Sequence, residues 1–469
     1  MPRESLVGPP ADTDPTHALA DFAVALRFAD IPPSVVAITK RMILDALGAA
    51  IAASTLGPGC AASMKVMQAL GGPAESTILG LGAKVAAPNA AFANGALVHA
   101  LNYDPAGAET GHLGVVCLVA PLAMAEAVGN VSGATLLTAS IVACEVKARI
   151  TAALVRAGVQ PSNKFMPGQL LSYLPCAAGA AKILGLDAER FRSAFGLALM
   201  QSAGSRQPVL TGDPPAKAIY GAFPNQAGVL AARLAEAGLG ADMDVLNPPA
   251  GLFTMVYGDK GDRSVITAEL GRDYLLTDVE FKAWSASNHV TPFIEAACEI
   301  AAQGVAAQDI ATIEVVAHPL VQPWCEPLAQ RRRPDNAAAA GNSIPFCVAK
   351  TLAHGDLGLA DFTDDGLKDA TAHAVADKLT YRLDENMKGG AVIVTTRDGK
   401  RIEKHIPIPL GHPSRPISDE RLRDKFRDCC KHSATPLPAR NIEALIQMVD
   451  TLESLDDIAR LTALATGGA

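Results

Sequence analysis

Aromatic side chains are scarce in this sequence. They make up 4% of its 469 residues, whereas 49% of the residues are hydrophobic and 40 are glycine. Small residues let helices approach one another closely, so the composition predicts closely packed helices rather than a core filled by large rings. Single cores stop growing beyond about 250–300 residues, and we therefore expect two domains.

The sequence also has no surplus of positive charge. Its formal net charge is -8 at pH 7, and lysine and arginine never gather into a basic face. Nucleic-acid binding depends on such a face, because most of the contacts are made to phosphates. We therefore expect no nucleic acid among the partners.

The nine cysteines lack the paired CxxC spacing of zinc ribbons and redox motifs. Their odd number, in a chain long enough to fold without disulfides, favours reduced thiols and no structural zinc. The amino-terminal stretch MPRESLVGPPADTDPT is polar and lacks the apolar run of a signal peptide. Uncharged runs such as 85–103 contain proline and asparagine and do not suit a bilayer span. We expect a soluble, cytoplasmic protein without a membrane segment.

Several nucleotide and hydrolase motifs are absent as well. The sequence contains no GxGxxG after a predicted strand, no GxxxxGK[ST], no GxSxG and no HExxH. Nucleotide binding, serine hydrolysis and zincin chemistry therefore lose their usual sequence support.

Three parts follow one another along the chain. From 15 to 274, apolar residues recur at three- and four-residue spacing, which predicts an all-helical domain. From 275 to 405, alternating segments such as IATIEVVAHP predict antiparallel strands with helices between them. From 406 to 469, amphipathic helices are expected to return to the first domain. The predicted fold class is mainly α, with a large all-helical domain plus a smaller α+β domain.

Polar residues gather in HALNYDPAGAETGHLGVV, a stretch that begins at His99 between two predicted helices. Loops between helices are places where polar side chains converge easily on a pocket, and Asp104 and His112 both lie here. The helix that follows His112 would lower the pKa of its imidazole and favour a neutral base. Helix capping by Asp104 and His112 explains the same pattern equally well.

A second candidate cluster is GDPPAKAIYGAFPNQAG. Lys217 and Tyr220 are three positions apart, so a helix that starts after Pro215 would place both on one face. A lysine in a pocket can bind a carboxylate or stabilise developing negative charge. The pattern alone favours the alternative, a solvated lysine and an interface tyrosine.

The third cluster is FKAWSASNHVTPFIEAA, at the entrance of the second domain. His289 and Thr291 precede Pro292, which is expected to start a helix, and Trp284 offers an amphipathic wall. A capping threonine and a surface histidine explain this cluster equally well.

With these clusters in this order, the chain resembles the MmgE/PrpD family, which includes 2-methylcitrate dehydratase, cis-aconitate decarboxylase and iminodisuccinate epimerase. The likeness runs from about residue 15 to 430 and rests on seven collinear segments. They are IPPSVVAITKRMILDALGAAIAA, ANGALVHALNYD, GHLGVVCLVAPLAMAEA, CAAGAAKILGLDAERFRSAFGLALMQSAG, AKAIYGAFPNQAGVLAARLAEAGL, NSIPFCVAKTLAHGDLGLADFT and PLGHPSRPISDERLRDKF.

The resemblance implies a pocket between the two domains, a homodimer, and catalysis without a metal or organic cofactor. Enzymes of this kind move a proton next to a carboxylate of a small di- or tricarboxylate, with loss of water, loss of CO2 or inversion. Such reactions need a cation or donor for the developing enolate and an acid-base group for the carbon proton. Lys217 and His112 supply this minimum pair.

This chain departs from the family pattern at several positions. In the family's H-x-x-D-F-D-D segment, the first aspartate corresponds to Asn102 and the second to Asp104. His112 retains the histidine of the usual GHP, but Met166 stands where HPTG has a histidine. Asparagine can orient a substrate but cannot accept a proton, and Met166 makes its wall of the pocket apolar.

The third cluster departs too, because the usual histidine before P-x-I-D-A falls on Thr291, although His289 could substitute. With Asn102, Met166, His289 and Thr291 as expected substrate contacts, the substitutions indicate a different substrate or proton route. Tyr220, close to Lys217, is the best replacement acid.

The leading hypothesis is a cofactor-independent lyase, a dehydratase or decarboxylase, acting on a small carboxylic acid. Lys217 would bind the carboxylate or enolate, His112 would shuttle the proton, and Asp104 would orient the substrate or the imidazole. The alternatives are an epimerase or isomerase of a small dicarboxylate such as iminodisuccinate, and a non-catalytic binding member of the family. We expect Asp104, His112, Lys217, Tyr220 and His289 to line one cavity at the domain junction.

Overall fold

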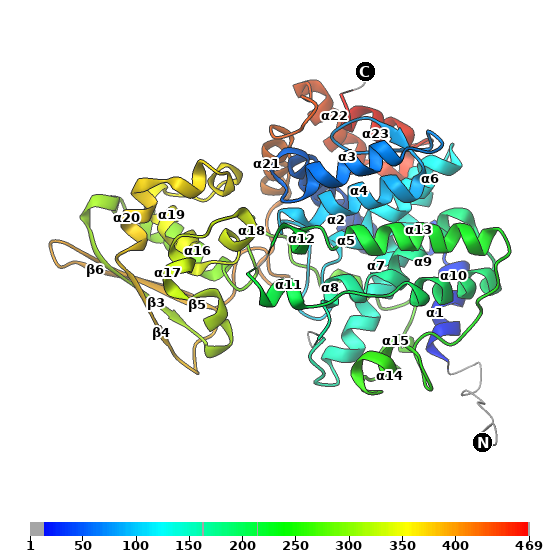
Figure 1. Cartoon of the computed structure of the whole chain (residues 1–469), viewed down its shortest axis with the longest axis horizontal. Coiled ribbons are helices and arrows are strands. Elements are labelled where there is room, and N and C mark those ends of the chain that lie inside the picture. Colours follow the sequence, from blue (N-terminus) through cyan, green and yellow to red (C-terminus); the bar gives the residue numbers. More distant parts are fainter. Residues whose placement is uncertain (1–13, 162–163, 213, 468–469) are drawn as a thin grey trace.

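The computed structural model describes residues 14–161, 164–212 and 214–467, so most of the amino-terminal stretch discussed above lies outside the described residues. A large helical body lies beside a smaller domain that contains a four-stranded sheet (Figure 1). The predicted fold class, mainly α with a large helical domain and a smaller α+β domain, is confirmed.

Helices make up nearly all of the large domain, and several of them begin with a proline whose fixed φ suits a first helical position. The first half of the domain contains α1 (Pro15–Ala25), α2 (Pro33–Leu56), α3 (Cys60–Leu70), α4 (Ala87–Ala100), α5 (Gly114–Cys117), α6 (Val119–Val128) and α7 (Gly133–Val155). Then follow α8 (Pro167–Leu170), α9 (Tyr173–Leu184), α10 (Ala188–Met200), α11 (Gln207–Leu210), α12 (Pro215–Ala218), α13 (Ala222–Glu236), α14 (Leu252–Tyr257) and α15 (Ser264–Thr267).

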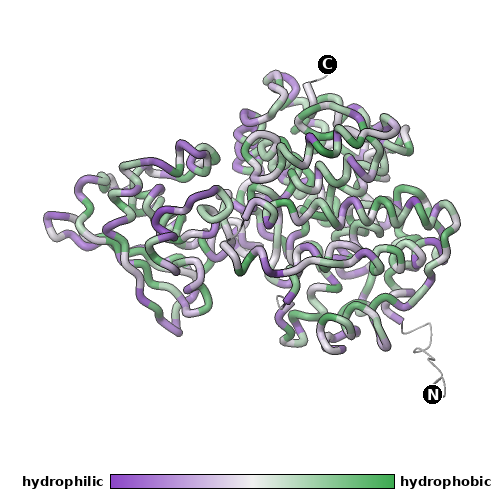
Figure 2. The backbone as a smooth tube through the Cα atoms, viewed as in Figure 1, coloured by the Kyte–Doolittle hydropathy of each residue, from purple (hydrophilic) through white to green (hydrophobic). Residues whose placement is uncertain are grey.

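Short elements connect these helices. They are the hairpin of β1 (Ser76–Thr77) and β2 (Lys84–Val85) and the 3-10 turns η2 (Phe28–Asp30) and η3 (Leu275–Thr277). Hydrophobic segments run through the packed helices, whereas many hydrophilic stretches lie at outer turns and hairpin ends (Figure 2).

Small residues set the distances between the helices, as the scarcity of aromatic residues predicts. A Cβ atom on Gly95 of α4 would lie 2.5 Å from the backbone oxygen of Gly221, just before α13. A Cβ atom on Gly228 of α13 would lie 2.6 Å from the backbone nitrogen of Ala177 in α9. Glycine is therefore required where α13 crosses its neighbours.

The smaller domain combines a mixed sheet with helices. Its strands are β3 (Ile310–Ala317), β4 (Leu379–Leu383), β5 (Gly390–Thr396) and β6 (Arg401–Ile406), in the order β4-β3-β5-β6. Its helical elements are α16 (Thr291–Ala301), η4 (Ala307–Asp309), η5 (Pro319–Trp324), α17 (Leu328–Arg332), α18 (Ala337–Ala340), α19 (Ile344–His354), η6 (Leu359–Phe362), η7 (Gly366–Lys368) and α20 (Ala370–Ala376).

The prediction of purely antiparallel strands is wrong for one pair. β3 and β4 are parallel, whereas β3–β5 and β5–β6 are antiparallel. The chain between β3 and β4 passes through α17 to α20, and parallel neighbours require a long crossover connection of this kind.

After β6 the chain returns to the large domain through α21 (Asp419–Cys430), α22 (Ala439–Asp450), η8 (Leu452–Ser454) and α23 (Ala459–Ala465). α21 and α22 pack against α2, as Figure 1 shows, and η8 packs against α7. One hydrophobic core runs through residues up to Phe281 and takes in residues of these last helices, such as Phe426. A second core begins at Trp284 and ends at Ile406. The cores therefore divide between 281 and 284, a few residues beyond the sequence-based boundary at 275.

Two findings bear on the expected environment. All nine cysteines are free, and eight of them are buried. Among the described helices, none combines the length and apolarity needed to cross a bilayer. A cytoplasmic location stays a prediction.

Candidate active site

The loop between α4 and α5 carries the first candidate cluster. α4 ends at Ala100, and Asn102 follows in the left-handed region with a φ of 50°. Asparagine adopts this conformation more readily than most residues, so it turns the chain out of the helix. The loop then passes Asp104, which the fold buries completely, and reaches His112 just before α5.

Asp104 bridges two histidines. One carboxylate oxygen lies 2.9 Å from Nδ1 of His99, and the other lies 3.1 Å from Nδ1 of His112. The side chains of His99 and His112 are 5% and 29% exposed, so His99 is buried and His112 opens to solvent on one side. The rings of the two histidines lie edge to face, with centroids 4.7 Å apart.

The protonation states of this triad follow from its geometry. Burial alone would raise the pKa of Asp104, but the charges and hydrogen bonds of His99 and His112 hold it well below its usual value. Burial lowers the pKa of His112, and it lowers the pKa of His99 to about 4. An ionised carboxylate only accepts hydrogen bonds, so Nδ1 of each neutral imidazole carries its proton and Nε2 remains a proton acceptor.

A cavity of about 680 Å³ opens at the domain junction, a size typical of small-molecule sites. Its walls come from the Asp104–His112 loop, the segment before α16, η5, the turn before β5 and the return segment before α21. They include Asn102, Gly111, His112, Glu280, Lys282, Asn288, His289, His318, Met387 and His412.

Lys282 is the cation of this cavity, and the sequence analysis did not select it. Its side chain is 4% exposed, and Nζ donates to the backbone oxygen of Asn102 at 2.8 Å and to its Oδ1 at 2.6 Å. Burial lowers the pKa of Lys282 to about 8, so the ammonium remains protonated at neutral pH. A lysine between Phe281 and Trp284, inside an apolar segment, was the available sequence signal.

Lys217 borders a different, smaller space. This pocket measures about 30 Å³ and also touches His99, Asn102, Ser285 and Phe362. Such a volume holds one or two water molecules and is too small for a di- or tricarboxylate. Asn102 is common to both spaces. Lys217 and His112 therefore border two spaces that meet at Asn102.

Tyr220 packs against the triad instead of lining either space. Its ring centroid lies 4.1 Å from that of His99. The hydroxyl is buried, has no hydrogen-bond partner among the described residues, and lies where a Cβ atom on Gly168 would be only 2.4 Å away. Burial and the charge of Asp104 raise the pKa of Tyr220 well above its usual value. In this arrangement Tyr220 holds the His99 ring in place.

Of the remaining predicted substrate contacts, one lies on the wall of the large cavity and two are buried away from it. His289 lies on the wall of the large cavity, with its ring 4.2 Å from that of Trp324. Thr291 is buried at the start of α16, where its hydroxyl donates to the backbone oxygen of Asn288 at 2.9 Å. Met166 is buried in the large core before α8. Thr291 and Met166 do not border either space, so of the four predicted substrate contacts only Asn102 and His289 line the large cavity.

Behind the His112 loop lies a second lysine that the sequence analysis missed. Lys147 of α7 is 1% exposed, and its Nζ donates to Oγ of Ser172 at 2.7 Å. A Cβ atom on Gly111 would lie 3.5 Å from its Cε, which places the lysine against this loop. Burial lowers the pKa of Lys147 to about 7, and its positive charge contributes to the lowered pKa of His112.

The triad also has the composition of a metal site. The ligand atoms of His99, Asp104 and His112 lie within 4.8 Å of one another, and imidazole with carboxylate suits several divalent ions. An ion at this point would have to displace the Nδ1 protons that now bind Asp104. The arrangement is thus already satisfied as a hydrogen-bonded His–Asp–His unit, and catalysis without a metal stays a prediction.

Comparison with known proteins adds the evolutionary context. Residues 17–264 match the MmgE/PrpD N-terminal domain, and residues 284–451 match the MmgE/PrpD C-terminal domain. Human cis-aconitate decarboxylase is 26% identical over 464 residues, covering 96% of this chain and 94% of that protein. The cis-aconitate decarboxylase-like protein oryM of Aspergillus oryzae is 24% identical over 96% of this chain and 97% of its own length. The 2-methylcitrate dehydratase-like protein oryR of the same fungus is 25% identical, covering 88% of this chain and 87% of that protein.

Proposed function

The chain belongs to the MmgE/PrpD family, and from this premise we propose that it is a lyase, a dehydratase or decarboxylase, acting on a small carboxylic acid. Relatives named as cis-aconitate decarboxylase and 2-methylcitrate dehydratase-like support the lyase class. The reaction begins with proton transfer at a carbon next to a carboxylate.

The observation that carries this proposal is the pairing of His112 with Asp104 at the cavity wall. Asp104 accepts the Nδ1 proton, which fixes the tautomer and orientation of the ring. The lowered pKa of His112 favours the neutral imidazole at neutral pH. A neutral, oriented imidazole beside a substrate-sized cavity is a general base.

Lys282 supplies the complementary charge. Its ammonium lies on the same cavity wall and binds the substrate carboxylate and, once the carbon proton has left, the enolate oxygen. Asn102 holds the ammonium through two oxygens but brings no charge of its own. In this scheme Lys217 is a second cation on the far side of Asn102 rather than the main carboxylate ligand.

Mass spectrometry tests the proposal. We expect the purified protein, incubated with small di- and tricarboxylates in D2O, to convert at least one of them with loss of water or CO2. His112→Asn removes the base and should lower turnover by about 10²–10⁴-fold, whereas the control His405→Asn changes an exposed histidine and should not. Deuterium uptake without mass loss would instead identify an epimerase or isomerase. Binding without any turnover would identify a non-catalytic member.

Two further expectations belong to the same proposal. Activity should survive dialysis against EDTA, because the proposed chemistry needs only side chains. The chain should also form a homodimer, which light scattering of the purified protein measures directly.

A further inference from the structure

The large cavity contains a single carboxyl group that the scheme above does not use. Its walls carry the ammonium of Lys282 and four imidazoles, groups that suit a polycarboxylate ligand. Among its described lining residues, Glu280 is the one acidic side chain. A carboxylate there would repel a carboxylic acid substrate, so its presence needs a chemical reason.

The position of Glu280 is fixed against the catalytic loop. Its backbone N–H donates to the oxygen of Ala106 at 2.6 Å, and the N–H of Ala106 donates back at 3.1 Å. One side-chain oxygen, Oε2, accepts from Nδ2 of Asn288 at 2.6 Å. Within the described part of the chain this is the one hydrogen bond of the carboxyl group, so Oε1 remains available.

The surroundings of Glu280 favour its protonated form. Burial raises the pKa of Glu280, Asp278 on the same segment adds to the rise, and the positive charges of His412 and Lys282 partly offset it. Burial acts on His112 in the opposite sense and lowers its pKa. One cavity therefore holds a carboxyl group whose burial favours the protonated form beside an imidazole whose burial favours the neutral form. When the surroundings of two titratable groups shift their pKa values in opposite directions, the two groups commonly act as an acid and a base with separate roles.

We propose that Glu280 is the general acid that protonates a leaving hydroxyl group, and that the substrate is a hydroxy-substituted di- or tricarboxylic acid. The inference rests on the proposed lyase function and narrows it to dehydration. Nε2 of His112 takes the proton from the carbon next to the carboxylate. The electron pair of that C–H bond becomes the new C=C bond, and the C–O bond breaks. The departing oxygen takes the proton of Glu280 and leaves as water, after which solvent returns the proton from His112 to Glu280.

We choose a hydroxy acid as the substrate because the loss of water needs both an acid and a base in the site. Elimination of water requires a base at the carbon and an acid at the oxygen within one site. Decarboxylation of an unsaturated acid has no hydroxyl group to protonate, so it does not require this pairing. A wall that combines one carboxyl group with Lys282 and four imidazoles matches a ligand with one hydroxyl group among carboxylates.

Glu280→Gln is the decisive variant, because glutamine keeps the shape and the contact with Asn288 but cannot give up a proton. The probes are citrate, 2-methylcitrate and malate, each incubated in D2O with the wild type and the variant. We expect water loss to fall by about 10²–10⁴-fold in the variant. Exchange of the carbon-bound hydrogen for deuterium should persist, since His112 and Lys282 remain. A merely structural effect would lower both rates together.

Glu403→Gln is the matched control, since it makes the same change at an exposed carboxylate that does not line the cavity. It should leave both rates close to those of the wild type. The inference fails if Glu280→Gln dehydrates the probes at the wild-type rate. It also fails, while the lyase proposal stands, if the wild type converts only acids without a hydroxyl group and releases CO2. If neither reaction occurs with any acid, the lyase proposal itself is lost.

Discussion

The ammonium of Lys282 lies 2.6 Å from Oδ1 of Asn102, so the main cation of the cavity is held by a neutral side chain. An aspartate at this position would form an ion pair with Lys282 and cancel much of its charge. The amide positions the lysine while leaving its charge to a substrate carboxylate. The asparagine at residue 102 thus has a physical role.

Asn102→Asp should weaken substrate binding. We expect KM to rise about tenfold, which corresponds to about 1.4 kcal/mol, and the pKa of Lys282 to move above 8 because a neighbouring anion favours the ammonium. Aspartate also tolerates the positive φ of residue 102, so the backbone should not change. The dependence of KM on pH measures both effects. Asn130→Asp, at an exposed residue with a φ of 53°, is the control and should leave KM unchanged.

The acid limb of the pH profile should report His112. The base must be neutral to act, and burial lowers its pKa below the ordinary value of 6.5. We therefore expect the acid limb of kcat/KM to have its midpoint below pH 6.5. Substrates of different pKa should give the same limb. A midpoint above pH 6.5 would contradict the assignment of His112 as a buried base.

Lys147→Met should change both this limb and the stability. Loss of the positive charge favours protonation of His112, so the acid limb should move to higher pH by a few tenths of a pH unit. The folded-state pKa of Lys147 is about 7 and the unfolded value is 10.5, so the unfolded chain binds more protons between these limits. The wild type should therefore gain up to about 1.4 kcal/mol per pH unit across this window from this residue. Urea unfolding of wild type and variant at pH 7 and pH 9 measures the difference. An equal change in the free energy of unfolding of both proteins between these two pH values would rule out this contribution of Lys147.

His99 should make the fold sensitive to acid. Its pKa is about 4 in the folded protein and 6.5 in the unfolded chain, so the unfolded state binds the proton first as the pH falls below 6.5. The stability lost between pH 6.5 and pH 4 from this buried residue amounts to about 3 kcal/mol. His99→Gln keeps a polar side chain without the titration. Thermal unfolding of this variant should depend less on pH across that window than unfolding of the wild type.

Local sequence patterns predicted the elements and one half of the site. The helical spacing between about residues 18 and 258 predicted the large domain, and the Asp104–His112 loop was found because its polar residues interrupt that pattern. These inferences succeeded because periodicity and loop position are properties of a short segment. The pairing of His99 with the same carboxylate depends on the loop that turns back after α4, because Asp104 lies beyond the end of that helix.

The other half of the site depends on contacts between distant segments. Lys282 becomes a cavity cation because Asn102, far away in sequence, turns its oxygens toward it. Its backbone is held in turn by Lys425 of α21, whose Nζ donates to the oxygen of Lys282 at 3.0 Å. Conversely, Lys217 lies on a four-residue helix that leads into a separate small pocket. Spacing along the chain carries no information about either arrangement.

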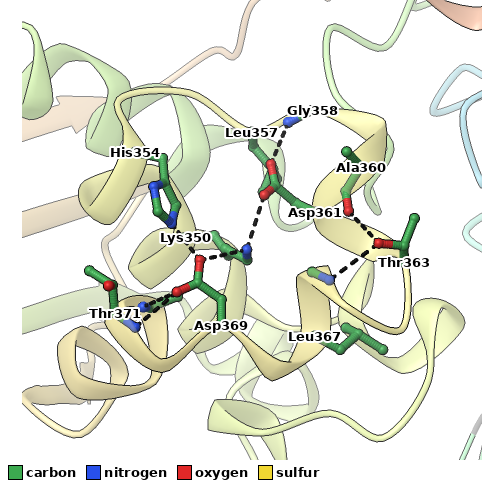
Figure 3. Close-up of polar contacts among 12 residues, drawn as sticks. Lys350, His354, Leu357, Gly358, Ala360, Asp361, Thr363, Leu367, Asp369 and Thr371 are labelled. Carbon is green, nitrogen blue, oxygen red and sulfur yellow. Dashed lines mark hydrogen bonds and ion pairs between the residues drawn. The ribbon is translucent and has the colours of Figure 1, made fainter. Parts of the chain in front are cut away.

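A buried ion cluster in the smaller domain gives the last prediction. Lys350 of α19 is 3% exposed and lies 3.0 Å from Asp361 and 2.9 Å from Asp369, which also contacts His354 (Figure 3). Burial alone would raise the pKa of Asp369, but hydrogen bonds from Lys350, Ala372 and His354 hold it well below its usual value. The segment fixed by these contacts includes Phe362, which borders the pocket of Lys217.

Lys350→Met should therefore cost about 3–5 kcal/mol, because it leaves two partly buried carboxylates without their shared cation. The loss should be largest at neutral pH and should shrink as the pH falls below 3.8, where protonation removes the unpaired charges. Denaturant unfolding at pH 7 and pH 3.5 measures this trend. Arg333→Met breaks the exposed pair with Asp377 and should cost less than about 1 kcal/mol. Equal losses in the two variants would mean that the buried cluster adds no more stability than a surface pair.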